Sequence, residues 1–468
     1  MIKFLGAVIL GGGLFIGGCA KKQTASFQSL KNPEAAVQLK SFVAEKEAQA
    51  NAATNKMPSE FQAFFAVAAK GDWLTASNAF VEFRKHAGQY EHSDKTKIDE
   101  RLRGTAWQAV LEIWGALDAF GEGDEKYSLA IGTNIIASIP PGSIYFGGTD
   151  PGRFIVTAMC KSQVNADPFF VLTQNALADG TYLDYLRAMY GEKIYVPTQE
   201  DSQRCFQDYI QEAQTRLQNH QLKPDEDIRT DSNGRVQVSG QVAVMEINGL
   251  LVKIIFDKNP GHEFYIEESF PFDWMYPCLE PHGLIFKINR QPLPALSDEI
   301  VQRDHDYWAH LVQPMIGGWL NDDTPVEQVA AFAKKTFGKQ NFTGFSGDPC
   351  FIQNAYSHKM FSKLRSSLGG LYAWRLKHAT DASEKDRMAH EADFAFRQAW
   401  ALCPYSPEAV FRYVNFLLAQ DRSADALLVA ETAAQMPSMQ GKDGEQIRDL
   451  VELLKKFQKE GQTPSGGK

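Results

Sequence analysis

The chain has 468 residues, 44% of them hydrophobic, which is enough for about two to four domains with packed cores and excludes a disordered chain. Its formal net charge is -9 at pH 7, and the sequence contains no cluster of basic residues of the kind that binds a phosphate backbone. The composition therefore argues against nucleic acid as a partner.

Residues 1–19 have the pattern of a bacterial export signal. A charged start is followed by an apolar run, residues 4–16, that is too short for a membrane span. The run leads to Cys19 in the sequence IGGC, which resembles the bacterial lipobox, where the cysteine is linked to diacylglycerol. An ordinary signal peptide, or an anchor helix with an incidental cysteine, is the alternative. By resemblance to the sorting rule of enterobacterial lipoproteins, Ala20 implies an outer-membrane anchor facing the periplasm of the cell envelope.

The remaining cysteines are scattered and do not form a motif. None belongs to a CxxC pair or has a zinc-type spacing, and their odd number leaves at least one unpaired. We therefore expect no metal site, no disulfide framework and no cofactor. These residues are Cys160, Cys205, Cys278, Cys350 and Cys403.

The segment before the first strand is predicted to be a tether and then a helical region. Residues 20–57 are polar and rich in Ala, Gln, Lys and Glu, and we expect a tether that becomes helical near Pro33. In residues 58–139 the aromatic and alanine residues recur at helical spacing, and residues 69–80 loosely resemble a tetratricopeptide hairpin. A last helix is expected over residues 125–139.

Residues 140–295 alternate between strand-like and helix-like segments. This alternation predicts an α/β domain with a mostly parallel, Rossmann-like sheet and helices on both faces. Thr198 and Asp201 form a capping box at the start of a helix whose buried stripe is expected to contain Phe206, Ile210, Ala213 and Leu217. The expected strands are residues 143–146, 169–172, 193–196, 235–238, 263–266 and 284–288, with helices at residues 182–189 and 242–256.

The C-terminal third is predicted to be helical again. Residues 296–357 form a helical linker region with a second capping box at Thr324. Residues 358–460 match the tetratricopeptide pattern, in which small residues let two helices cross closely, and residues 461–468 are a tail. The positions that match are Leu368, Gly369, Tyr372, Ala392, Phe396, Ala399 and Pro404 in one repeat, and Val410, Tyr413, Leu417, Ala426, Ala430, Ala433 and Pro437 in another.

Polar residues follow the first two predicted strands, where an open α/β sheet places its ligands. The turn at residues 147–153 could present backbone N–H groups, Arg153 and the positive end of the following helix to an anion. It is neither a dinucleotide fingerprint nor a P-loop. In the alternative interpretation Asp150 caps that helix and Arg153 pairs with a local carboxylate. The candidate ligand-binding residues are Thr149, Asp150, Arg153, Gln174, Asn175 and Asp179.

Other groups of residues give weaker signals. Glu267 or Glu268 could join Asp150 or Asp179 for acid–base work or sugar binding, although adjacent strand residues face opposite sides. Aromatic residues at 274 and 276 could stack on a sugar ring or belong to the core. Histidines at 305 and 310 do not share a helical face, so a metal site is not indicated.

Several stretches together resemble the extracytoplasmic portion of bacterial multi-spanning glycosyltransferase-like membrane proteins related to protein O-mannosyltransferases. The resemblance implies an α/β domain after the last membrane span, often followed by tetratricopeptide repeats. The chain departs from the family because no later segment of 18 or more uncharged apolar residues follows residue 16, so the spans that the family uses are missing. The stretches are FGGTDPGRF (146–154), LTQNALAD (172–179), EES (267–269), WMYP (274–277), PHGL (281–284) and KLRSS (363–367).

These observations lead to one expected function and two alternatives. We expect a lipid-anchored envelope protein without catalysis, whose α/β domain binds a ligand and whose helical repeats bind a protein partner. The first alternative is an accessory of envelope glycosylation that binds or transfers a glycan or lipid-linked sugar, and any enzyme activity would be glycosyltransferase-related. The second treats the motifs as scaffold only.

Overall fold

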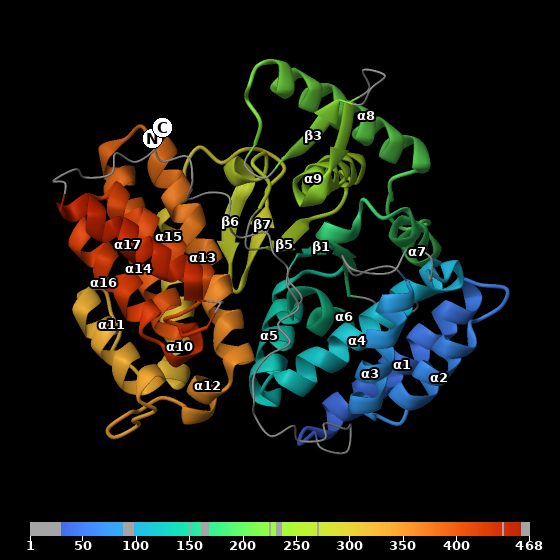
Figure 1. Cartoon of the computed structure of the whole chain (residues 1–468), viewed down its shortest axis with the longest axis horizontal. Coiled ribbons are helices and arrows are strands. Elements are labelled where there is room, and N and C mark those ends of the chain that lie inside the picture. Colours follow the sequence, from blue (N-terminus) through green and yellow to red (C-terminus); the bar gives the residue numbers. More distant parts are fainter. Residues whose placement is uncertain are drawn as a thin grey trace. The chain divides into compact units, whose positions relative to one another are not determined.

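The computed structural model describes residues 30–87, 98–148, 151–160, 168–223, 226–230, 236–268, 271–441 and 444–459. These residues are mostly helical, with a small mixed sheet, and they divide into an N-terminal unit that ends at Ile266 and a C-terminal unit that begins at Glu267 (Figure 1). None of the helices in the described ranges is long and apolar enough to cross a membrane. Cys19, the predicted lipidation site, lies outside the described residues.

The N-terminal unit contains helices α1 to α9 and strands β1 to β5, and β1 and β2 carry the predicted site. Its helices are α1 (Pro33–Ala52), α2 (Ser59–Ala68), α3 (Trp73–His86), α4 (Ala106–Glu122), α5 (Glu125–Ser138), α6 (Val156–Met159), α7 (Gly180–Tyr190), α8 (Gln199–Gln218) and α9 (Gly240–Lys258). Its strands are β1 (Ile144–Gly147), β2 (Phe170–Thr173), β3 (Asp227–Thr230), β4 (Val236–Ser239) and β5 (Phe264–Glu267), the last of which ends at the boundary.

The C-terminal unit begins with two strands and continues as helices. The strands are β6 (Leu279–His282) and β7 (Ile285–Ile288). The helices are α10 (Asp298–Ile316), α11 (Val326–Ala333), α12 (Pro349–Gln353), α13 (Ala355–His378), α14 (Ala382–Leu402), α15 (Pro407–Ala419), α16 (Ser423–Ala434) and α17 (Glu445–Lys459).

Five strands form one mixed sheet in the order β2-β1-β5-β7-β6. β1 and β2 are parallel, with Gly147 opposite Thr173, so the ends of these strands lie side by side as predicted. β6 and β7 are antiparallel, because a tight turn at Gly283, whose φ is 64°, joins them directly. The sheet is therefore only partly parallel, and β6 is a strand that the sequence pattern did not predict.

The strand predicted at residues 193–196 is absent. The backbone of Tyr195 is bonded instead by one side-chain amide: Tyr195 N donates to Asn259 Oδ1 at 2.7 Å, and Asn259 Nδ2 donates to Tyr195 O at 3.0 Å. Burial of Ile194 and Val196 explains the strand-like pattern. A side chain from the end of α9 has thus taken the place of a neighbouring strand.

The predicted strand at residues 235–238 exists as β4 but belongs to a separate two-stranded sheet. β4 pairs with β3 in antiparallel register, with Ile228 opposite Val238. Ile228 packs with Tyr209, Ala213 and Ala243 from α8 and α9 in a small core of its own. This hairpin and its two helices therefore form a local layer of the N-terminal unit.

Residues 33–52, which we expected within a tether, belong to the packed N-terminal unit as α1. The predicted helix start near Pro33 is confirmed, with Asn32 Oδ1 accepting from the N–H groups of Glu34 and Ala35. α1 buries Leu39, Phe42 and Val43 and contacts α4. The helix is therefore held by the core and does not act as a spacer.

The helix predicted after Thr324 exists, but its predicted capping box was wrong. α11 begins at Val326 without a side-chain cap. The hydroxyl of Thr324 instead accepts from Asn321 N at 2.9 Å and donates to Trp319 O at 3.3 Å. Thr324 therefore closes the preceding turn, because its side chain faces back along the chain.

The C-terminal helix pairs from α13 to α17 stack on one another, as the repeat pattern predicted (Figure 1). α13 and α14 form the most extensively packed pair, and α15, α16 and α17 follow in order. Pro437 is exposed, but most of the other side chains at the matching positions are buried: Leu368, Tyr372, Ala392, Phe396, Ala399, Val410, Tyr413, Leu417, Ala426, Ala430 and Ala433.

Two adjacent glycines on α13 provide a test of the close helix crossing. A Cβ at Gly369 would lie 2.9 Å from the ring of Phe396 and 3.3 Å from Ala395 Cβ, whereas at Gly370 the nearest atom is in Arg412 at 3.7 Å. We expect Gly369→Ala to lose about 1–3 kcal/mol of unfolding free energy through overpacking. Gly370→Ala, the matched control, should gain up to about 1 kcal/mol from helix propensity. Urea unfolding measures the unfolding free energy of both variants, and equal changes in the two would contradict the close crossing of α13 and α14.

Candidate functional site

The turn that follows β1 is fixed by close packing around Gly147. A Cβ at Gly147 would lie 2.9 Å from Arg153 Cα and 3.1 Å from Gly152 O, so only glycine lets the chain return this closely. The hydroxyl of Tyr145 donates to Gly152 O at 2.9 Å, and that of Thr157 donates to Arg153 O at 2.7 Å. The backbone of Arg153 is therefore held in place by the end of β1.

The residue after Arg153 is held equally firmly. Phe154 is buried, and its ring occupies a notch on α4 that exists because residue 115 is glycine; a Cβ at Gly115 would overlap the ring. The Arg153 guanidinium lies over the same ring, with its central carbon 4.4 Å from the ring centroid. The side chain of Arg153 thus lies against a buried ring that is packed tightly on α4.

The guanidinium of Arg153 has donors that the described residues leave unused. Its Nε and Nη2 are buried, and neither has a hydrogen-bond partner in the described part of the chain. Burial raises the pKa of the nearby Tyr182 to about 12, while the positive charge of Arg153 acts to lower it. The side chain therefore presents a cation and two unsatisfied N–H groups near the carboxyl ends of β1 and β2.

Gln174 and Asn175 lie at the end of β2 and hold the turn together. Asn175 Nδ2 donates to Gly148 O at 2.9 Å, and Gln174 Nε2 donates to Asn175 Oδ1 at 3.3 Å. Asn248 on α9 supports the same turn, because its Nδ2 donates to Asn175 O and its Oδ1 accepts from Ala178 N. Asn248 was not predicted; the only sequence signal was a polar residue inside an apolar helix.

The remaining predicted site residues are Asp179, Thr149 and Asp150. Asp179 caps α7, since its Oδ1 accepts from Thr181 N at 2.9 Å and its Oδ2 accepts from Gln108 Nε2 at 3.1 Å. Thr149 and Asp150 lie outside the described residues. The helical segment after the turn is a π-type turn, Pro151–Ile155, followed by the four residues of α6, so a helix dipole contributes little there.

The weaker candidates of the C-terminal unit are engaged in packing. Glu267 and Glu268 are both buried, and Glu268 O accepts from Ser367 Oγ at 2.6 Å. The Tyr276 ring stacks on Trp374 with 5.6 Å between ring centroids, and both rings are half-buried. Within the described ranges no group of three or more His, Cys, Asp or Glu side chains could hold a metal ion.

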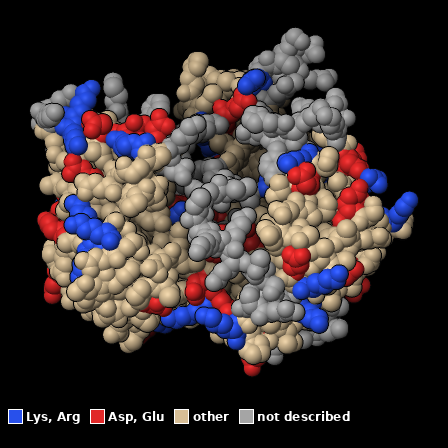
Figure 2. Space-filling model, turned by 60° about the horizontal axis from the view of Figure 1, so that its bottom comes forward, with Lys and Arg blue, Asp and Glu red and all other residues tan. Residues whose placement is uncertain are grey.

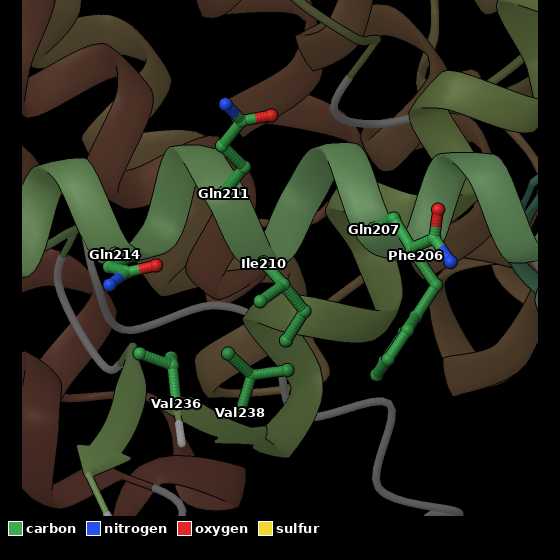
Figure 3. Close-up of a pocket in the computed structure, with 7 residues that line it drawn as sticks. All are labelled: Phe206, Gln207, Ile210, Gln211, Gln214, Val236 and Val238. Atoms are coloured by element: carbon green, nitrogen blue, oxygen red, sulfur yellow. The ribbon is translucent and has the colours of Figure 1, made fainter. Parts of the chain in front are cut away.

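A groove of about 550 Å³ lies between α8 and β4 (Figure 3). Ile210 points toward Val236 and Val238, whereas Gln211 extends away from them. The predicted buried stripe of α8 is confirmed only in part: Ala213 is buried, but Cys205 and Tyr209 are buried in place of Phe206, which is 48% exposed and lines the groove. Of the predicted site residues that the structure describes, none lines it.

Charged side chains of both signs are interspersed on the described surface of the face that Figure 2 shows. Comparison with known proteins adds no relative: no family model, no curated protein and no solved structure matches the chain. The resemblance to glycosyltransferase-like membrane proteins therefore stays a prediction. The geometry at β1 and β2 is the basis on which a function can be argued.

Proposed function

We propose that the N-terminal unit is a binding module for an anionic ligand, with a phosphate or carboxylate group held by Arg153 at the carboxyl ends of β1 and β2. The observation that carries the proposal is the pair of buried guanidinium donors, Nε and Nη2, which have no partner among the described residues. Buried donors without partners are costly, and two oxygens of one carboxylate or phosphate group can accept from both of them at once.

The surroundings of Arg153 support binding more than catalysis. The turn is held by Gly147, Tyr145 and Thr157, so little ordering is needed when a ligand arrives. The nearby phenol of Tyr182 has a pKa of about 12, and the neighbouring side chains at the end of β2 are amides. These groups donate and accept hydrogen bonds at neutral pH without exchanging protons.

Calorimetric titration with inorganic phosphate and with a sugar phosphate tests the proposal. We expect Arg153→Gln to weaken binding by about 10- to 150-fold, the equivalent of about 1.5–3 kcal/mol for charge-assisted hydrogen bonds. Arg153→Lys keeps the positive charge but loses the planar guanidinium that donates two parallel hydrogen bonds. Its affinity should therefore lie between those of wild type and Arg153→Gln. Arg187→Gln is the matched control, because Arg187 on α7 already donates to Pro197 O and pairs with Asp184.

Two outcomes count against the site. Wild-type protein that binds neither phosphate compound would rule out phosphate as the ligand group, and equal affinities of wild type and Arg153→Gln would place any binding elsewhere. Binding of the sugar phosphate but not of inorganic phosphate favours the glycosylation alternative, since the sugar must then contribute contacts of its own.

The proposal includes the cell-envelope setting that residues 1–19 indicate. A lipid anchor at Cys19 would hold the module at the outer membrane facing the periplasm, and metabolic labelling with a fatty acid tests this. Lack of label on the protein would contradict the anchor.

The tetratricopeptide-like character of α13 to α17 is part of the proposal as a scaffold. One face of α13 is covered within its own unit, since Ser367 bonds Glu268 O and Arg375 donates to the carbonyls of Pro277 and Leu293. Binding of a protein partner by these helices stays a prediction.

A further inference from the structure

Two histidines and two carboxylates form a cluster in the C-terminal unit. His305 on α10 lies with Nδ1 3.2 Å from Glu391 Oε2 and Nε2 3.7 Å from Asp322 Oδ2. His390 on α14 lies with Nδ1 3.3 Å from Glu391 Oε1 and Nε2 4.0 Å from Asp322 Oδ1. Each imidazole therefore lies between the same two carboxylates, one on α14 and one in the turn at residues 317–325.

The position of the cluster makes it a link between three segments. The His305 ring stacks on Phe394 of α14, with 4.6 Å between centroids and 17° between planes. The turn is held from the other direction by Arg397 of α14, which donates to Asp322 O at 2.9 Å and to Thr324 O. The backbone of the turn is thus fixed by a permanent cation, whereas the Asp322 side chain faces groups that can gain or lose a proton.

The pKa shifts of His305 and Glu391 favour a protonated imidazole paired with an ionised carboxylate. The hydrogen bond to Glu391 raises the pKa of His305 against the opposing effect of burial; the charges of Glu391 and Asp322 also raise it, and that of Arg365 on α13 lowers it. Burial by itself would raise the pKa of Glu391, but the hydrogen bond from His305 and the charges of both histidines lower it overall.

The directions of these two pKa shifts define the pH range in which the pair stabilises the turn. A raised histidine pKa means that the stabilisation is complete below the ordinary value of 6.5 and is lost as the pH rises through the raised value. A lowered carboxyl pKa means that stabilisation is present above 4.5 and is lost as the pH falls below it. The link is therefore strongest between these values and weakens above neutrality.

We propose that His305, His390, Glu391 and Asp322 form a proton-operated latch that holds the 317–325 turn on α10 and α14 in mild acid and loosens it at alkaline pH. This inference concerns the C-terminal unit alone and does not depend on the ligand site at Arg153.

Backbone hydrogen exchange of the full-length protein, corrected for intrinsic rates, measures the latch. We expect protection of the amides in residues 317–325 to fall by about a factor of ten between pH 5.5 and pH 8.5. His305→Gln should abolish this pH dependence, and Asp322→Asn, in an exposed turn, should reduce it even if the first variant fails to fold. His310→Gln on the same helix should keep it, because its ring is bonded to the carbonyl of Asp306.

Protection of the turn that does not change between the two pH values in wild type would overturn the latch. So would an unchanged pH dependence in both His305→Gln and Asp322→Asn.

Discussion

Replacing Arg365 by methionine should lower the unfolding free energy of the C-terminal unit by about 3–5 kcal/mol. Arg365 on α13 is fully buried, and its Nη1 pairs with Asp304 Oδ2 on α10 at 2.7 Å. Its Nε donates to Gln398 Oε1 at 2.7 Å, and Tyr372 donates its hydroxyl to the same Asp304 oxygen at 2.8 Å. The substitution removes the cation and leaves a buried carboxylate without its counter-charge.

Urea unfolding of three variants measures this prediction. Arg303→Gln, one residue from Asp304 but exposed, is the control and should change stability by less than about 0.5 kcal/mol. The double variant Arg365→Met with Asp304→Leu should recover part of the loss, because an apolar pair needs no counter-charge. A loss for Arg365→Met as small as that of Arg303→Gln would contradict the buried pair.

Lys46→Met should destabilise the N-terminal unit by a similar amount, about 3–5 kcal/mol. Lys46 on α1 is fully buried, and its Nζ lies 2.6 Å from Glu112 Oε2 on α4. The Tyr185 hydroxyl on α7 accepts from Lys46 Nζ and donates to Glu112 Oε2, each at 2.8 Å. Burial raises the pKa of Tyr185 well above its ordinary value, so the phenol keeps the proton that it donates.

The matched control is Lys40→Met, an exposed lysine on the same helix, with an expected change below about 0.5 kcal/mol. Limited proteolysis is the second measurement: Lys46→Met should expose the backbone around α1 to cleavage, because the helix is held by this ion pair and by its apolar face. If α1 is cleaved in Lys46→Met no faster than in wild type and Lys40→Met, the pair does not hold the helix.

Predictions from the sequence succeeded where the interactions are local. The capping box of α8 is confirmed, with Asp201 N donating to Thr198 Oγ1 and Thr198 N donating to Asp201 Oδ2. The parallel pairing of β1 and β2 and the stacked helix pairs are also confirmed, because both follow from regular spacing of apolar residues.

Two of the failures come from partners that are distant in sequence. The alternation at residues 193–196 could not indicate that Asn259 would bond the backbone of Tyr195, and that bond replaced a strand. Likewise, the polar pattern of residues 20–57 gave no sign that Lys46 is buried. Its charge is stable inside the protein only because Glu112, which is distant in sequence, faces it.

The candidate site shows the same division. Asp179 was predicted to be a ligand-binding residue, and its side chain caps α7. The unused donors of Arg153 could not be predicted, because they result from the position of Phe154 in the notch at Gly115 and from the return of the chain past Gly147.

The most direct test of the account is a crystal structure of the protein grown with selenate or a sugar phosphate, which locates the anion. We predict electron density for the anion within hydrogen-bond distance of Arg153 Nε and Nη2, at the ends of β1 and β2. Anion density found only elsewhere, with those two nitrogens bonded to ordered water or to a protein group, would contradict the proposed site.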